Sequence, residues 1–215
     1  MAQINLTNLR RELDPQINKI VYPKIRARIE REFETSKDQL VRSFVNAGPS
    51  KELDELANTD RESRVDYVSP YTQGHGNLYA FLGFANDRNP TEEVKDYLEQ
   101  NVRLKSITHG AFNRDGNYVV TGKVEVPTLK EINASSTLDW SSRGWIDALV
   151  NGVRGMPEFL FGMFADNPKS LSGAGIELKK TRVRSDSFKP YNGNYLSQFL
   201  ERFKVKIRTG KTTKE

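Results

Sequence analysis

The chain contains no cysteine and only two histidines, His75 and His109, among its 215 residues. Without cysteine it can form no disulfide, no zinc–thiolate site and no thiol nucleophile. Neither histidine has a partner at a metal-ligand spacing such as H-x-x-x-H, so both are interpreted as ordinary turn or strand residues. We therefore expect no catalytic residue, no metal site and no cofactor.

Other catalytic patterns are incomplete in the same way. Gly210-Lys211-Thr212 resembles the end of a phosphate-binding loop, but the required glycine five residues earlier is Val205. Ser172 lacks the G-x-S-x-G frame of a hydrolase nucleophile. These absences favour a structural or assembly protein over an enzyme. A hydrolase whose catalytic residues are dispersed along the sequence is a weaker alternative, ranked after a structural protein and a nucleic-acid-binding protein.

Long apolar runs are also missing, since no stretch approaches the roughly 18 residues of a membrane-spanning helix. We therefore expect no membrane partner. Hydrophobic residues make up 36% of the chain, below the roughly 45–50% of typical globular domains, a figure that also counts glycine. This deficit indicates an elongated shape, or a surface that partner proteins complete.

Charge is distributed unevenly along the chain, although its formal net value is only +5. Residues 48–102 hold five Lys and Arg against eleven Asp and Glu, whereas residues 177–215 hold eleven against four. Regions of opposite sign can attract one another within a molecule, or between neighbours in a ring or stack. The alternative is that both regions are solvated faces.

The hydrophobic pattern predicts an α+β fold with a long N-terminal helical arm and a small, mainly antiparallel sheet covered by helices. Apolar residues recur at helical spacing up to residue 45, with a helix start at Pro15, a kink at Pro23 and an end at Gly48-Pro49. The division predicted from this pattern is an arm over 1–48, an α+β domain over 49–208 and a flexible tail over 209–215.

Within the α+β domain, turn and capping residues delimit the remaining elements. The Asp115-Gly116 pair predicts a hairpin, and Asn89-Pro90 predicts a helix start. The strands expected are 77–84, 104–112, 117–126, 176–184 (as a third strand of the hairpin sheet) and 204–208, and the helices 51–57, 90–102, 140–153 and 195–203.

Two groups of residues are candidates for contacts with partners. Aromatic side chains in glycine-rich blocks build close packing and contact surfaces, so we expect subunit or partner contacts at Phe81, Phe84, Trp140 and Trp145. Trp140 and Trp145 are five residues apart and lie on different faces of a helix, so one can pack in the core and the other against a partner, or both can pack in the core.

The second group is basic. Lys180, Arg182 and Arg184 alternate along a predicted strand and therefore project from one face. These side chains could neutralise DNA phosphates or contact an acidic partner surface.

Two blocks of the sequence resemble the tail-completion (neck) proteins of long-tailed bacteriophages. The first is residues 76–84, Gly-Asn-Leu-Tyr-Ala-Phe-Leu-Gly-Phe, followed by the Asn89-Pro90 helix start. The second begins at Gly144-Trp145, continues through the Ser-Gly-Ala-Gly-Ile-Glu-Leu-Lys stretch at 172–179, and ends with 188–200. The resemblance covers roughly residues 76–208 and rests on packing motifs.

This resemblance implies a structural virion protein, assembled in the host cytoplasm, that forms a homo-oligomeric ring in the phage neck. Such a ring lies between the portal-bound adaptor protein and the tail terminator or tail tube protein. It joins the DNA-filled head to the tail and leaves a channel that DNA contacts transiently and without sequence preference. The alternative is a nucleic-acid-binding accessory protein that uses the basic C-terminal third.

Overall fold

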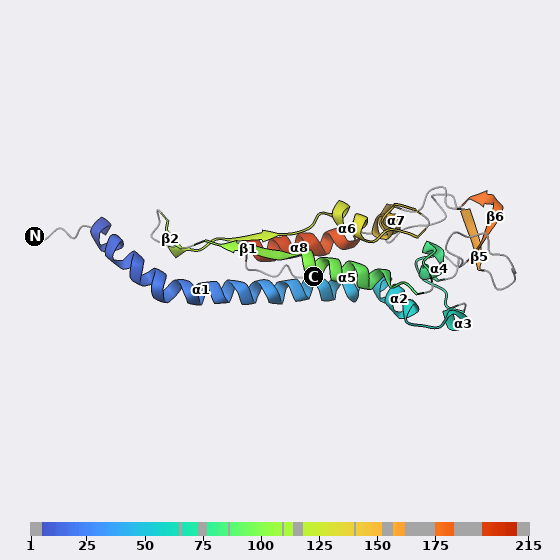
Figure 1. Cartoon of the computed structure of the whole chain (residues 1–215), viewed down its shortest axis with the longest axis horizontal. Coiled ribbons are helices and arrows are strands. Elements are labelled where there is room, and N and C mark those ends of the chain that lie inside the picture. Colours follow the sequence, from blue (N-terminus) through green and yellow to red (C-terminus); the bar gives the residue numbers. More distant parts are fainter. Residues whose placement is uncertain are drawn as a thin grey trace, which may run out of the picture.

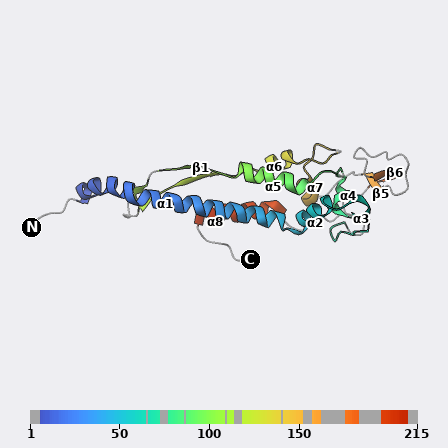
Figure 2. The ribbon, with the colours of Figure 1, turned by 60° about the horizontal axis from the view of Figure 1, so that its bottom comes forward.

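Helix α1 (Leu6–Val45) runs along most of the length of a rod-shaped molecule, a strand hairpin lies beside it, and the other helices lie along its C-terminal half or beyond it (Figures 1 and 2). The computed structural model gives an α+β architecture with small antiparallel sheets, which confirms the predicted fold class. It describes residues 6–64, 66–72, 77–85, 87–108, 110–113, 118–139, 141–151, 157–161, 175–182 and 195–209, with only the backbone for 6–14, 17–18, 61, 111, 157–161, 175–182 and 209.

The predicted helix start at Pro15 is wrong, because Pro15 and Pro23 both lie inside α1, which runs without interruption from Leu6 to Val45. Each proline removes one backbone hydrogen bond and crowds the preceding turn. The helix bends toward its N-terminal end but does not break (Figure 1). The hydrogen-bonded turns on either side and the contact with the strands hold the helix together. The tyrosine hydroxyl of Tyr22, for example, donates to the carbonyl oxygen of Ile107 at 3.1 Å.

The predicted division after residue 48 coincides with the end of α1 but not with a boundary in the core. Phe33, Leu40 and Phe44 of α1 are buried in the same cluster as residues of helices α2, α4, α5, α6, α7 and α8. Helix α8 (Tyr195–Thr209) packs antiparallel to α1, since Tyr195 contacts Phe44 while Phe203 contacts Phe33. The N-terminal half of α1 extends away from the buried core.

The middle of the chain supplies the short helices around this core. Helix α5 (Pro90–Asn101) begins where predicted, because the Asn89 side chain accepts hydrogen bonds from the backbone N–H groups of Thr91 and Glu92. The others are α2 (Gly48–Ala57), α3 (Arg61–Arg64), α4 (Leu78–Leu82), α6 (Leu129–Ser135) and α7 (Trp145–Asn151).

The strand predicted over residues 77–84 is instead the one-turn helix α4. Asn77 caps its start by accepting a hydrogen bond from the Ala80 N–H at 2.7 Å. Gly83 ends it with φ 73°, and the N–H groups of Gly83 and Phe84 bond back to Ala80 and Tyr79. This is a Schellman motif, in which the residue with left-handed backbone geometry is usually glycine. The hydrophobic contact that accompanies the motif is between the rings of Tyr79 and Phe84, whose centroids are 5.5 Å apart.

The predicted hairpin is confirmed as a long two-stranded ribbon beside α1 (Figure 2). Strand β1 (Arg103–Ile107) pairs with β4 (Gly122–Glu125), and β2 (Ala111–Phe112) pairs with β3 (Tyr118–Val119), both antiparallel. A β-bulge interrupts the pairing between Leu104 and Ser106. Gly122 lies against α1, where an added Cβ would be 3.6 Å from Ile29 Cγ2.

Two predictions for the C-terminal region are wrong. Strand β6 (Gly175–Arg182) does not join the hairpin sheet but pairs antiparallel with β5 (Pro157–Phe161) in a separate sheet at the far end of the rod (Figure 1). Residues 204–208 are not an edge strand, because α8 continues to Thr209. The helical spacing of Leu200, Phe203 and Ile207 extends the buried face through this segment.

Candidate functional site

The structure corrects two of the four predicted aromatic contact residues. Phe84 and Trp145 are fully buried in the core of the chain itself, so their side chains are not available to a partner. Phe81 is half-buried and packs against that core. Trp140 lies outside the described residues. In the described part of the first block, the Asn77 and Gly83 caps turn the chain so that Tyr79 and Phe84 are buried.

The predicted basic triplet is described only in part. Lys180 and Arg182 lie two residues apart on strand β6, which places them at positions of equal parity. Arg184 lies outside the described residues, and so does the predicted tail beyond Thr209. The prediction that these residues contact DNA or an acidic partner stays a prediction.

An acidic surface lies on α2, α3 and the loop that follows them, toward one end of the rod; we name residues 51–72 the acidic cap. This segment holds six Asp and Glu against three Lys and Arg, and Arg64 is buried. Asp60, Glu62 and Asp66 are exposed. Burial and the negative charges of Glu52 and Glu55 raise the pKa of Tyr67, so the Tyr67 hydroxyl lies in the negative field of the cap.

Glu52 is the buried centre of the acidic cap. Its two carboxylate oxygens accept hydrogen bonds from the Ser69 hydroxyl and the Leu78 backbone N–H, both at 2.7 Å. The carboxylate thereby joins α2 to the following loop and to the start of α4. Burial raises the pKa of Glu52, although these two hydrogen bonds act in the opposite direction.

The raised pKa of Glu52 predicts a pH-dependent stability difference. Folding favours the protonated side chain, so its stabilising contribution is present below the unfolded pKa and is lost as pH rises through the folded pKa. Glu52→Gln keeps a neutral side chain at every pH. We expect the free energy of unfolding of the wild type, relative to that of Glu52→Gln, to fall as pH rises from 4 to 8. Urea unfolding across this range measures it, and a constant difference would contradict the prediction.

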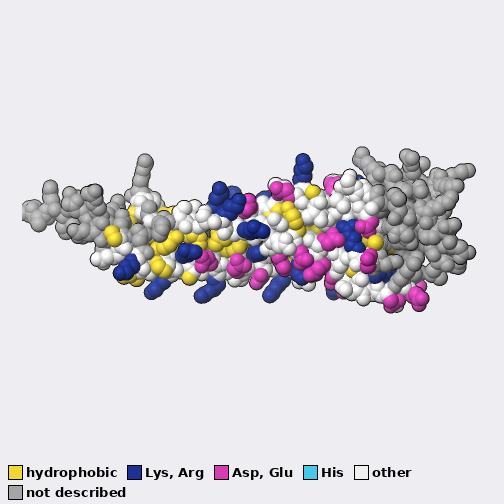
Figure 3. Space-filling view, viewed as in Figure 1, with side chains coloured by type: hydrophobic (Ala, Val, Ile, Leu, Met, Phe, Trp, Pro, Cys, Tyr) yellow, Lys and Arg dark blue, Asp and Glu magenta, His cyan; other side chains and the backbone are white. Residues whose placement is uncertain are grey.

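A basic surface lies on the opposite half of the rod; we name residues 19–31 of α1, with the β1–β4 ribbon and residues 202–208 of α8, the basic arm. Residues 19–31 hold five Lys and Arg and one Glu. The antiparallel packing of α8 brings its basic last turn, with Lys206 and Arg208, to the same half. Figure 3 shows Lys and Arg along this half and Asp and Glu gathered toward α2.

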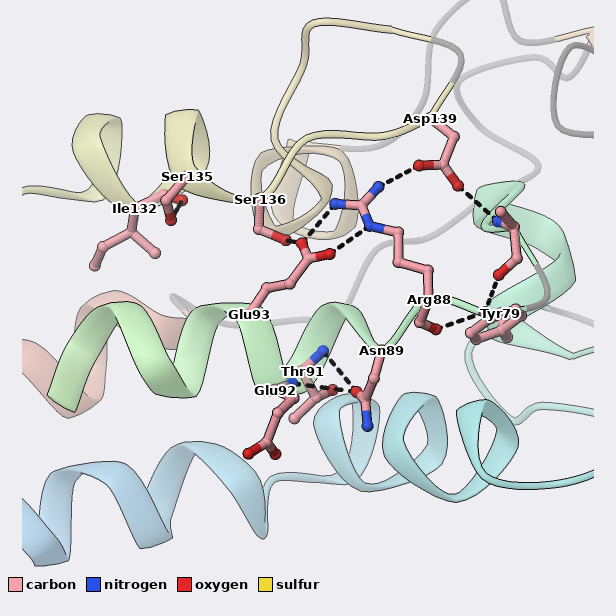
Figure 4. A network of polar contacts seen from close by, with 11 residues as sticks. Tyr79, Arg88, Asn89, Thr91, Glu92, Glu93, Ile132, Ser135, Ser136 and Asp139 are labelled. Carbon is pink, nitrogen blue, oxygen red and sulfur yellow. Dashed lines mark hydrogen bonds and ion pairs between the residues drawn. The ribbon is translucent and has the colours of Figure 1, made fainter. Parts of the chain in front are cut away.

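A third polar feature joins three segments beside the core; we name it the Arg88 clasp (Figure 4). The Arg88 guanidinium binds both carboxylate oxygens of Glu93 on α5, each at 2.6 Å, and also pairs with Asp139. Asp139 in turn accepts the backbone N–H of Ala85 at 2.6 Å, and the Ser136 hydroxyl donates to Glu93 at 2.7 Å. The clasp therefore ties the chain after α4 to α5 and to the connection between α6 and α7.

The charged groups of the Arg88 clasp are paired with one another. Burial alone would raise the pKa of Glu93, but the hydrogen bonds from Arg88 and Ser136 outweigh it and lower that pKa. The hydrogen bond to Glu93 raises the pKa of Arg88. Arg88 and Glu93 therefore stabilise each other in their charged forms. The arrangement is that of a structural fastener, since its polar side chains bind one another and a backbone N–H of the same chain.

Among the residues that the structure describes, no three His, Asp or Glu side chains gather in a way that could hold a metal ion. No described helix is long and apolar enough to cross a membrane. Sequence reasoning missed both Glu52 and the Arg88 clasp. The partners of Arg88 are five and 51 residues away in sequence, and only the Asn89-Pro90 helix start gave a signal near them.

The chain matches no protein-family model, no curated protein and no solved structure.

Proposed function

We propose that this chain is a structural virion protein of the phage neck, where copies form a ring that joins the DNA-filled head to the tail. The observation that carries the proposal is the pair of oppositely charged surfaces on the two halves of one rod, the basic arm and the acidic cap. A repeating contact between copies requires two different, complementary surfaces. The resemblance of residues 76–208 to tail-completion proteins supplies the biological setting.

The partners proposed on this basis are further copies of the chain, the portal-bound adaptor protein on the head side and the tail terminator or tail tube protein on the tail side. DNA passes through the ring and touches it only transiently. The glycine-rich blocks that carry the resemblance support a structural role, because they are used for helix capping and core packing. The protein's place is the virion neck, after assembly in the host cytoplasm.

The basic arm also favours a second candidate, a nucleic-acid-binding accessory protein. Lys19, Lys24 and Lys123 are exposed, and exposed cations of this kind neutralise DNA phosphates without reading sequence. In a neck ring the same charges must bind DNA weakly, because tight binding would stall its passage. Affinity for DNA and its dependence on sequence therefore separate the two candidates.

Particles assembled without this protein test the neck proposal. We expect heads that are filled with DNA but carry no attached tails, as counted by electron microscopy, and added purified protein should restore joining. The isolated protein should bind unrelated DNA duplexes equally, with dissociation constants of about 10⁻⁴–10⁻⁶ M at physiological salt. Empty heads, or nanomolar binding that discriminates among sequences, would contradict the neck proposal and favour the second candidate.

A further inference from the structure

Two large apolar side chains lie uncovered on the basic arm. Ile20 is 61% exposed and its neighbour Val21 is also exposed. Lys24 lies one helical turn from both, four residues after Ile20 and three after Val21, so the three side chains share one face of α1. Lys19 and Lys24 are exposed and make no ion pair within the described part of the chain. The arm therefore presents an apolar centre beside uncompensated positive charge.

The acidic cap presents the same arrangement with the opposite sign. Val68 is 62% exposed and its neighbour Tyr67 is also exposed. Asp66 precedes them, and the exposed carboxylate of Glu62 lies on the helix α3 that leads into this segment. A Tyr hydroxyl in a negative field and an exposed valine form an amphipathic centre of the kind that protein interfaces bury.

These two surfaces cannot meet within one molecule, because the N-terminal half of α1 and helix α3 lie at opposite ends of the rod (Figure 1). We propose that the basic arm around Ile20 and Val21 of one copy docks on the acidic cap around Tyr67 and Val68 of a second copy. The apolar pairs form the dry centre of the contact, and Lys19 and Lys24 face Glu62 and Asp66 at its rim.

This contact is heterologous, since each copy offers its arm to one neighbour and its cap to the other. A heterologous contact generates a closed ring if its rotation closes, and a filament if it does not. The inference deepens the proposed function and rests on its homo-oligomeric part, but it is independent of any partner in the head or the tail. Charge complementarity across it sets specificity and orientation as well as attraction.

Charge reversal tests the pairing of the two surfaces. Lys19→Glu with Lys24→Glu removes the positive excess of residues 19–31 and places two carboxylates at the contact, and Glu62→Lys with Asp66→Lys makes the cap basic. Each double variant alone should self-associate at least about tenfold more weakly than wild type in sedimentation velocity at low salt, because the charged side chains that face each other at the rim then carry the same sign. An equimolar mixture of the two should assemble again, since every arm then finds a complementary cap.

The matched control reverses the same number of charges at mid-rod positions, with Lys95→Glu and Lys130→Glu, and should assemble like wild type. Raising the salt from 0.15 M to 1 M shortens the screening length from about 8 Å to about 3 Å. Wild-type assembly should weaken over this range. Restoration in the mixture is the result that general destabilisation of the fold would not produce.

Engineered cysteines identify the contact directly, because the natural chain contains none. Ile20→Cys and Val68→Cys, mixed as two single variants, should form a disulfide-linked dimer of one copy of each under mild oxidation. The Ile20→Cys, Val68→Cys double variant should form a ladder of covalent oligomers. Each single variant alone should remain uncross-linked, which excludes arm-to-arm and cap-to-cap contacts.

Three results would overturn the inference. These are a monomer at low salt and high concentration, an oligomer whose assembly neither charge-reversed variant weakens, and a disulfide-linked dimer of two Ile20→Cys chains.

A reversed arm that abolishes DNA binding while leaving assembly intact would assign the arm to nucleic acid instead. If the oligomer is insensitive to every variant, the proposed arm-to-cap contact fails but the neck proposal does not. If heads join tails without the protein, the neck proposal fails but the cross-linking result still holds.

Discussion

Replacing Phe84 by alanine is expected to lower the free energy of unfolding by about 3–5 kcal/mol, the usual cost of removing a fully buried phenylalanine ring. Phe84 lies immediately after the left-handed Gly83 and is completely buried against Tyr79. Its ring also lies 5.3 Å from the guanidinium carbon of Arg88. The truncation therefore removes three things at once: contacts in the core, the hydrophobic contact of the Schellman motif, and the ring that packs against the Arg88 guanidinium.

Phe81→Ala is the matched control, because Phe81 lies on the same short helix but is only half-buried. It should cost about half as much as Phe84→Ala. Urea unfolding monitored by circular dichroism measures both values, and the slope of the transition should stay unchanged. Equal losses for the two variants would show that residues 77–84 pack in some other way.

Arg88→Met is expected to lower the free energy of unfolding by about 2–3 kcal/mol at neutral pH. Removing one partner of a buried ion pair typically costs about 3–5 kcal/mol, and partial exposure of the side chains of Arg88 (18%), Glu93 (35%) and Asp139 (23%) reduces that figure. Methionine preserves the length and apolar stem of the side chain. The loss therefore reports mainly the two carboxylates left without their cation.

The effect of Arg88→Met should shrink as pH falls. In the wild type the lowered pKa of Glu93 contributes stability that is present above its unfolded pKa and is lost as pH falls through the folded pKa. Chemical unfolding at pH 7 and pH 4 measures this change. Arg26→Met, which removes an exposed helix pair with Glu30, is the control and should change the free energy of unfolding far less than Arg88→Met does.

A neutralised background provides a second check on the Arg88 clasp. Adding Glu93→Gln and Asp139→Asn to Arg88→Met removes the unpaired charges and should recover part of the lost stability. A triple variant less stable than Arg88→Met would show that the carboxylates stabilise the fold through contacts other than Arg88. Ser136 and the Ala85 N–H are the groups that such a result would implicate.

The parts of the fold that sequence reasoning predicted are those with strong local signals. The Asn89-Pro90 start of α5 is determined within four residues, by a side chain that accepts from the first free N–H groups. The β1–β4 hairpin follows from alternation around a turn. Helix α1 follows from the helical spacing of apolar residues along its length. Its two prolines mislead because each weakens only the turn around it, whereas the helix is held by its many other turns and by its packing against the rest of the fold.

The failures have one physical cause, which is that tertiary contacts override ambiguous local patterns. The sequence predicts a strand between glycines over residues 77–84, but Asn77 and Gly83 act as the caps of a short helix that buries Tyr79. Residues 204–208 alternate like a strand, yet buried Phe203 and partly buried Ile207 continue the inner face of α8. The pairing of β6 with β5, and the Arg88 clasp, depend on residues far apart in the sequence.

The ribbon made by β1 and β4 has a consequence for how copies avoid the wrong association. Among the described strands these two pair only with each other, so each has an outer edge of backbone groups that a ribbon from another copy could extend. The bulge between Leu104 and Ser106 breaks the regular spacing of that edge, and the charged side chains of Lys105, Lys123 and Glu125 stand on it. A bulge and charged side chains at a strand edge disfavour the pairing of ribbons from crowded copies into a continuous cross-β array.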